Sequence, residues 1–66
     1  MTKYRDCELY AMEQRPTGYW MAEVYRWGGY LGCTTMRSTS RAATVEAQGM
    51  VDRHLDGDSM PIVWGV

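Results

Sequence analysis

The chain has 66 residues, with seven Lys and Arg against eight Asp and Glu and a formal net charge of −1 at pH 7. This length leaves room for one small core, so we expect a single domain over residues 1–66. The balanced charge argues against the basic surface of a nucleic-acid-binding protein. No apolar run approaches the roughly 18 residues that span a bilayer, which argues against a membrane protein.

The large aliphatic residues are few: Leu, Ile and Val together number nine, and there is no Phe, against three Trp, five Tyr and six Met. From these counts we expect a core rich in aromatic residues and methionine. No signal peptide is recognisable, so we expect a cytoplasmic protein in which Cys7 and Cys33 are reduced, buried thiols.

Three strands are predicted in the first half of the chain. An imperfect alternation predicts a strand over 4–12, and the segment EQRPTG over 13–18 predicts a reversal because Pro16 and Gly18 both suit turns. The aromatic segment 19–27 is the clearest strand. Gly28 and Gly29 then predict a two-residue hairpin turn leading into a strand over 30–36.

With a turn at Gly28 and Gly29, Trp27 would face Tyr30 and Val24 would face Cys33, which divides the hairpin into two unlike faces. One face resembles a core and carries Trp20, Ala22, Val24, Leu31, Cys33 and the stem of Arg26. The other is aromatic and carries Tyr19, Met21, Tyr25, Trp27, Tyr30 and Met36. The pattern leaves open which of the two faces is covered.

A helix over about 41–55 is predicted to follow, with Ser38, Thr39 or Ser40 as its N-cap. Its apolar stripe carries Ala43, Ala47, Met50, Val51 and His54, and Asp52 points away. The helix should stop near Asp56, where Gly57 suits a left-handed cap. The apolar tail 61–66 (PIVWGV) either forms a fourth strand or adds to the sheet of a neighbouring copy.

The expected fold is therefore α+β, with an antiparallel sheet of three or four strands packed by one helix. The expected core consists of Leu9, Ala22, Val24, Leu31, Cys33, Ala43, Ala47, Met50 and Val51.

No residue pattern predicts catalysis, so we expect a protein that is not an enzyme and that has no cofactor and no metal. His54 is interpreted as a capping or half-buried imidazole that favours the negative end of the helix dipole. A zinc site formed by Cys7, Cys33 and His54 is a weaker alternative, because these residues lack the short paired spacing of structural zinc sites. The carboxylates are spread over strands and helix and form no assignable catalytic pair.

The aromatic face suits a protein interface, since Tyr, Trp and Met are enriched at interface centres. The leading hypothesis is a non-enzymatic interaction module that binds itself, as a homodimer, or another protein. Its expected partner-binding residues are Tyr19, Tyr25, Trp27, Tyr30 and Trp64. The alternative is a small nucleic-acid-binding domain that stacks bases on the same aromatic strands.

The order of residues between Gly18 and Pro61 resembles the small domain of HicB-like antitoxins. The points of similarity are Gly18, Tyr19 and Trp20 followed by Ala22 and Val24, then Leu31, Gly32 and Cys33, then His54, Leu55, Asp56 and Gly57 before Pro61. The resemblance implies a partial RNase H-like fold, a sheet with one main helix, no catalysis, and a toxin as the partner. The chain departs from the family in lacking the proline of its Leu-Pro-Gly-Cys segment.

Overall fold

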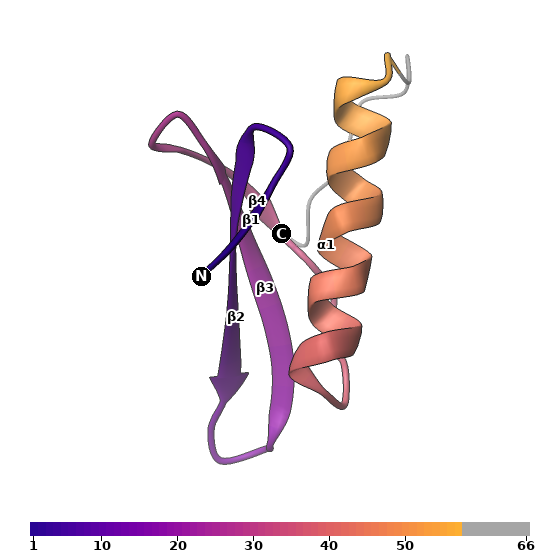
Figure 1. The fold of residues 1–66 in the computed structure, drawn as a ribbon. Helices are drawn as coiled ribbons and strands as arrows, with labels where there is room; N and C mark the ends of the chain where they lie inside the picture. Colours follow the sequence, from indigo (N-terminus) through magenta and orange to yellow (C-terminus); the bar gives the residue numbers. More distant parts are fainter. Residues whose placement is uncertain (58–66) are drawn as a thin grey trace.

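The computed structural model describes residues 1–57. Its elements are β1 (Thr2–Tyr4), β2 (Cys7–Gln14), β3 (Tyr19–Arg26), β4 (Gly29–Cys33) and α1 (Ser40–Leu55). The four strands form one antiparallel sheet in the order β1-β2-β3-β4, and α1 lies across one face of it (Figure 1). The predicted α+β class is confirmed. The predicted role of the tail 61–66 lies outside the described residues.

The fourth strand comes from the start of the chain, where the sequence predicted one strand over 4–12. Tyr4 pairs with Cys7, so Arg5 and Asp6 form a two-residue turn between β1 and β2. Arg5 has a φ of 55°, a conformation that a non-glycine residue adopts uncommonly. The prediction of a single strand was wrong because neither turn residue is a glycine or proline that would signal a reversal.

The reversal predicted over 13–18 is confirmed by the hairpin between β2 and β3. Gln14 pairs with Tyr19 at its end. Gly18 has a φ of 78°, and its N–H donates to the Gln14 carbonyl at 3.2 Å. The Thr17 hydroxyl donates to the same carbonyl at 2.6 Å. The turn is therefore closed by two donors on one acceptor.

The hairpin between β3 and β4 forms, but its predicted register was wrong, because the turn lies one residue earlier than predicted and the partners near it shift by two residues. Trp27 and Gly28 are the turn, with φ values of 53° and 79°, as a primed turn with two left-handed residues requires. Arg26 then pairs with Gly29 and Tyr25 with Tyr30. A register shift follows, in which Leu31 is the extra residue before Val24 pairs with Gly32. β4 ends at Cys33, short of the predicted residue 36.

The core lies between α1 and the face of the sheet that carries Leu9 and Val24. Buried apolar residues in the described part of the chain are Cys7, Leu9, Ala22, Val24, Cys33, Ala43, Ala47, Met50 and Val51. Of the nine predicted core residues, Leu31 is only partly buried and packs against the cluster, and Cys33 is buried but is paired with Glu23 on the opposite face of the sheet. The expectation of an aromatic and methionine-rich core was wrong. Small residues on α1 and β3 bring helix and sheet close together, and Tyr4 and Trp20 pack at the edge.

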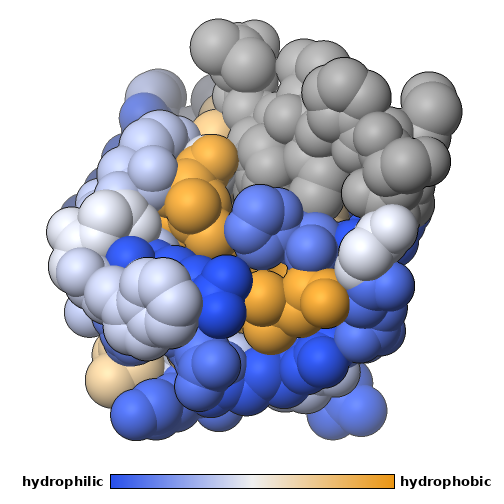
Figure 2. Space-filling view, turned by 90° about the horizontal axis from the view of Figure 1, so that it is seen from above, coloured by the Kyte–Doolittle hydropathy of each residue, from blue (hydrophilic) through white to orange (hydrophobic). Residues whose placement is uncertain are grey.

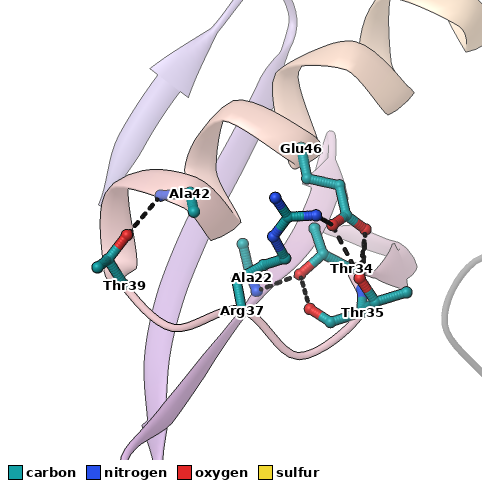
Figure 3. Close-up of polar contacts among 7 residues, drawn as sticks. All are labelled: Ala22, Thr34, Thr35, Arg37, Thr39, Ala42 and Glu46. Atoms are coloured by element: carbon teal, nitrogen blue, oxygen red, sulfur yellow. Dashed lines mark hydrogen bonds and ion pairs between the residues drawn. The ribbon is translucent and has the colours of Figure 1, made fainter.

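Helix α1 begins and ends near the predicted positions. Thr39 is the N-cap, and its hydroxyl oxygen accepts a hydrogen bond from the Ala42 N–H at 3.1 Å (Figure 3). Asp56 is the C-cap, and Gly57 follows with a φ of 80°. His54, predicted on the apolar stripe, is exposed. The stripe therefore ends at Val51 and Leu55, and His54 lies outside it.

The segment 34–39 between β4 and α1 closes the end of the core near the start of the helix. Thr34 is 3% exposed, and its hydroxyl oxygen accepts a hydrogen bond from the Ala22 N–H at 3.0 Å. The Thr35 N–H and hydroxyl both donate to the Glu46 carboxylate, which also accepts from Arg37 (Figure 3). The segment is thereby fixed to the sheet on one side and to the helix on the other.

Asp52 was predicted to point away from the sheet, and this was wrong. Its carboxylate accepts hydrogen bonds from the Tyr4 hydroxyl at 2.9 Å and from Arg5 at 3.1 Å, and Arg5 also donates to Asp56 at 2.9 Å. The hydrogen bond with Asp52 raises the pKa of Tyr4 above its ordinary value. These contacts join the β1–β2 hairpin to the last turn of α1.

Candidate functional site

One face of the sheet has no element of the described chain packed on it. In an antiparallel sheet, residues directly opposite each other share a face. The pairs Glu8 with Tyr25, Tyr10 with Glu23, Met12 with Met21, and Gln14 with Tyr19 therefore lie on the face opposite the helix. Lys3, Tyr30 and Cys33 join them through their own strand partners. We call this surface the open face.

Tyrosine rings form a contiguous row across three strands of the open face. The Tyr10 and Tyr25 ring centroids are 5.4 Å apart at an interplanar angle of 88°, and those of Tyr25 and Tyr30 are 5.4 Å apart at 65°. Edge-to-face contacts of this kind hold rings in fixed orientations. In this row Tyr10 is 40% exposed and Tyr30 55%. The row is therefore an ordered aromatic surface that solvent reaches.

A shallow groove crosses the open face beside this row. It is lined by Met1, Glu8, Tyr10, Ala11, Met12, Glu23, Tyr25 and Gly28. The Tyr25 hydroxyl donates to the Glu23 carboxylate at 3.0 Å, and this hydrogen bond raises the pKa of Tyr25. Tyr25 is thus held by a ring contact on each side and by a carboxylate at its hydroxyl.

Positive charge is nearly absent from the open face. Of the seven Lys and Arg residues, only Lys3 occupies one of its strand positions. The others include Arg5 and Arg37, which are paired with carboxylates of α1, and Arg26, which lies on the helix side within 3.7 Å of Asp6. The surface that could bind a partner is therefore aromatic and acidic.

The predicted partner-binding residues lie in different parts of the structure. Tyr25 and Tyr30 are cross-strand partners on the open face, with Tyr25 half-buried, and Tyr19 lies on the same face at the other end of β3. Trp27, predicted on the same face, is in the β3–β4 turn instead and is 78% exposed, with the Arg26 guanidinium 4.0 Å from its ring centroid. Trp27 is in the turn because the turn lies one residue earlier than predicted. Trp64 lies outside the described residues.

Sequence reasoning missed the two carboxylates and the tyrosine that border the groove. The alternation over 4–12 puts Glu8 and Tyr10 on the side of their strand away from Leu9, but nothing in the sequence linked that side to the aromatic residues of the next strand. The link is the pairing of Glu8 with Tyr25 and of Tyr10 with Glu23. The turn at Pro16 and Gly18 was the signal from which this register could have been worked out.

The residues considered for a zinc site are not brought together. Cys7 is opposite Arg26 on the helix side of the sheet, whereas Cys33 is opposite Glu23 on the open face. His54 is exposed near the end of α1. Within residues 1–57, no three His, Cys, Asp or Glu side chains cluster as metal ligands would. Burial raises the pKa of the Cys7 thiol, as expected for a thiol that packs as a small apolar group.

The end of the molecule where α1 stops offers a more broken surface. Viewed toward this end, hydrophobic residues form small separate patches between hydrophilic ones in the coloured part of the surface (Figure 2). The charged contacts of Arg5 with Asp52 and Asp56 lie at this end of α1.

Comparisons of the chain with protein-family models, with curated proteins and with solved structures found no match. In residues 1–57, no helix is both long enough and apolar enough to cross a membrane.

Proposed function

We propose that this chain is a non-enzymatic protein-interaction module that binds a protein partner through the open face of its sheet. The observation that carries the proposal is the one-sided packing of α1, which leaves Tyr10 and Tyr30 exposed beside the ordered ring of Tyr25, and Tyr19 exposed at the other end of β3. Tyrosine supplies a large contact area with few rotatable bonds, so little conformational entropy is lost when a partner covers it.

Binding of nucleic acid through the same rings is the less favoured function. Stacking of bases requires a groove whose cations follow the phosphates. Here the rings are bordered by Glu8 and Glu23, and Lys3 is the only cation at the strand positions of this face. The two carboxylates would repel a phosphate backbone, whereas a protein partner can present the opposite charge.

The resemblance to HicB-like antitoxins gives this proposal a more specific form, in which the partner is a toxin protein. The similar residues include Trp20, Ala22 and Val24, which form and support the sheet, and the helix end at Asp56 and Gly57. In this form the protein acts in the cytoplasm, where its thiols stay reduced, and it binds its partner without performing chemistry. The open face would then be the surface that contacts the toxin.

The proposal is tested by two variants that change surface residues of similar exposure to the same new residue. Tyr19→Lys with Tyr30→Lys alters the open face at positions that are 52% and 55% exposed. Val45→Lys is the matched control, because Val45 is 56% exposed on the helix. Each tagged protein is purified from cells that naturally make it, and the proteins bound in stoichiometric amount are measured by mass spectrometry and light scattering.

The proposal predicts that a protein partner, retained by wild type and Val45→Lys, is lost from the open-face variant. Retention of the same partner by the open-face variant, with normal folding shown by circular dichroism, would contradict it. Stoichiometric recovery of RNA in place of protein would also contradict it and would support the alternative function.

A further inference from the structure

We infer that the groove on the open face receives an arginine or lysine side chain from a basic segment of the partner. This inference rests on the proposed function and gives the partner a chemical identity. The groove is built on four residues in two adjacent cross-strand pairs, Glu8 with Tyr25 and Tyr10 with Glu23. We call these four residues the Glu–Tyr quartet.

The geometry of the quartet places rings and carboxylates alternately. Tyr10 and Tyr25 occupy one diagonal and touch edge to face, with ring centroids 5.4 Å apart. Glu8 and Glu23 occupy the other diagonal, so that one carboxylate lies on each side of the ring pair. Directly opposite residues have Cβ atoms only about 5 Å apart in such pairs, which puts all four side chains within reach of one inserted group.

The two carboxylates of the quartet have no cationic partner within residues 1–57. Among residues 1–57, no Lys, Arg or His nitrogen lies within ion-pair distance of either one, and the side-chain donor to Glu23 is the Tyr25 hydroxyl, a neutral group. Lys3 is opposite Glu8 in the register, yet its ammonium forms no ion pair with that carboxylate. Both glutamates are half-buried, so a cation placed between them would meet weaker solvent screening than at a fully exposed site.

The rings of the quartet add a second attraction for a cation. A guanidinium or ammonium close to the face of a tyrosine ring is attracted by the negative potential of that face. Two tyrosine rings with carboxylates beside them therefore favour a positive group, and arginine also stacks its planar guanidinium on aromatic rings. The same combination disfavours an acidic segment and a phosphate backbone.

A second copy of the chain is the poorer occupant of this groove. Packing of two open faces against each other would bring Glu8 and Glu23 of one copy toward the same carboxylates of the other, and Lys3 is the only strand cation available to offset them. Like charges brought together during desolvation oppose association. Charge complementarity therefore points to a different protein with a basic segment.

The test uses short capped peptides as probes and nuclear magnetic resonance of the full-length ¹⁵N-labelled protein. The first peptide alternates arginine and threonine. The second replaces each arginine with citrulline, which keeps the shape and removes the charge, and the third replaces each arginine with glutamate. The measured quantities are the peptide dissociation constants and the backbone amides of β2 and β3 whose chemical shifts change.

The variants separate the quartet from the rest of the surface. Glu8→Gln and Glu23→Gln remove one charge each, and Glu23→Gln keeps an acceptor for the Tyr25 hydroxyl. Glu13→Gln is the matched control, since Glu13 is on β2 but pairs with Trp20 on the helix side of the sheet. The inference predicts binding of the arginine peptide with shifts centred on the quartet, about fivefold weaker binding for each quartet variant, and unchanged binding for Glu13→Gln.

Equal binding of the citrulline or glutamate peptide would overturn the inference, as would an arginine peptide that causes no shifts in the quartet. If a natural partner is lost on Tyr19→Lys with Tyr30→Lys but is retained by both quartet variants, the inference fails and the proposed function stands. A concentration-dependent dimer that uses the quartet would overturn this choice of occupant in favour of a second copy. If every open-face variant retains the natural partner, both the inference and the proposed function are contradicted.

Discussion

The hydroxyl of Thr34 replaces a backbone carbonyl in the sheet, and its removal by Thr34→Val is the most informative stability test. Thr34 donates its N–H to the Ala22 carbonyl at 2.9 Å, as a strand residue would. The Ala22 N–H, however, donates to the Thr34 hydroxyl oxygen at 3.0 Å, and that hydroxyl donates to the Thr35 carbonyl at 2.9 Å. The side chain therefore continues the ladder where β4 ends.

The expected cost of Thr34→Val follows from burial. Valine has nearly the same shape, so packing changes little, but the N–H of Ala22, a residue with no exposed surface, is left without an acceptor. An unsatisfied buried donor costs about 1–3 kcal/mol. A chain of this size has a total stability of only roughly 3–10 kcal/mol. The midpoint of thermal unfolding should fall by about 4–8 °C for each kcal/mol lost.

Urea unfolding followed by tryptophan fluorescence measures this cost directly. Thr44→Val is the matched control, because the Thr44 hydroxyl only donates to the Ser40 carbonyl one helical turn earlier. The control should stay within about 0.5 kcal/mol of wild type, as surface changes do. A Thr34→Val protein as stable as the control would refute the assignment of the Thr34 hydroxyl as an essential acceptor.

Three further predictions concern the core, the tyrosines and the β3–β4 turn. Leu9→Ala should cost about 2–5 kcal/mol in urea unfolding, since Leu9 is 1% exposed beneath α1. The raised pKa of Tyr4 means that the folded chain holds this proton more tightly than the unfolded chain, so stability should be lost as the pH rises above the ordinary value of 10.0. Tyr4→Phe should reduce that alkaline loss, and an unchanged pH profile would argue against the contact with Asp52. Trp27→Asn should raise the free energy of unfolding by roughly 0.5–1 kcal/mol, because asparagine tolerates the left-handed conformation better, although the contact with Arg26 is lost.

The sequence contained the signals for the helix and the core. Thr39 is a standard N-cap residue, Gly57 follows the helix in the left-handed region, and Ala43 and Ala47 fall on the helical stripe that meets Val24. These features depend on local chemistry and on the periods of helix and strand. They could therefore be predicted without knowledge of how the strands pair.

Strand register was harder to predict because it depends on turns whose residues gave the wrong signal. Gly28 and Gly29 favoured a turn at those positions, whereas the chain turns at Trp27 and Gly28. Arg5 adopts a left-handed conformation, which the presence of an arginine does not predict. Leu31 is an extra residue in β4, and such a bulge leaves no clear mark in a short strand. The Glu–Tyr quartet depends on pairing across two strands, so it appeared only with the structure.

Hydroxyl-radical footprinting tests the binding role of the open face most directly. The protein is oxidised at low concentration in buffer and again in extract of the cells that make it, and modification is quantified residue by residue. The account predicts that Tyr10, Tyr19 and Tyr30 become protected in the extract, while Trp27 and Val45 keep their reactivity. Open-face tyrosines that stay as reactive in the extract as in buffer, or protection confined to Val45 on the helix, would contradict it.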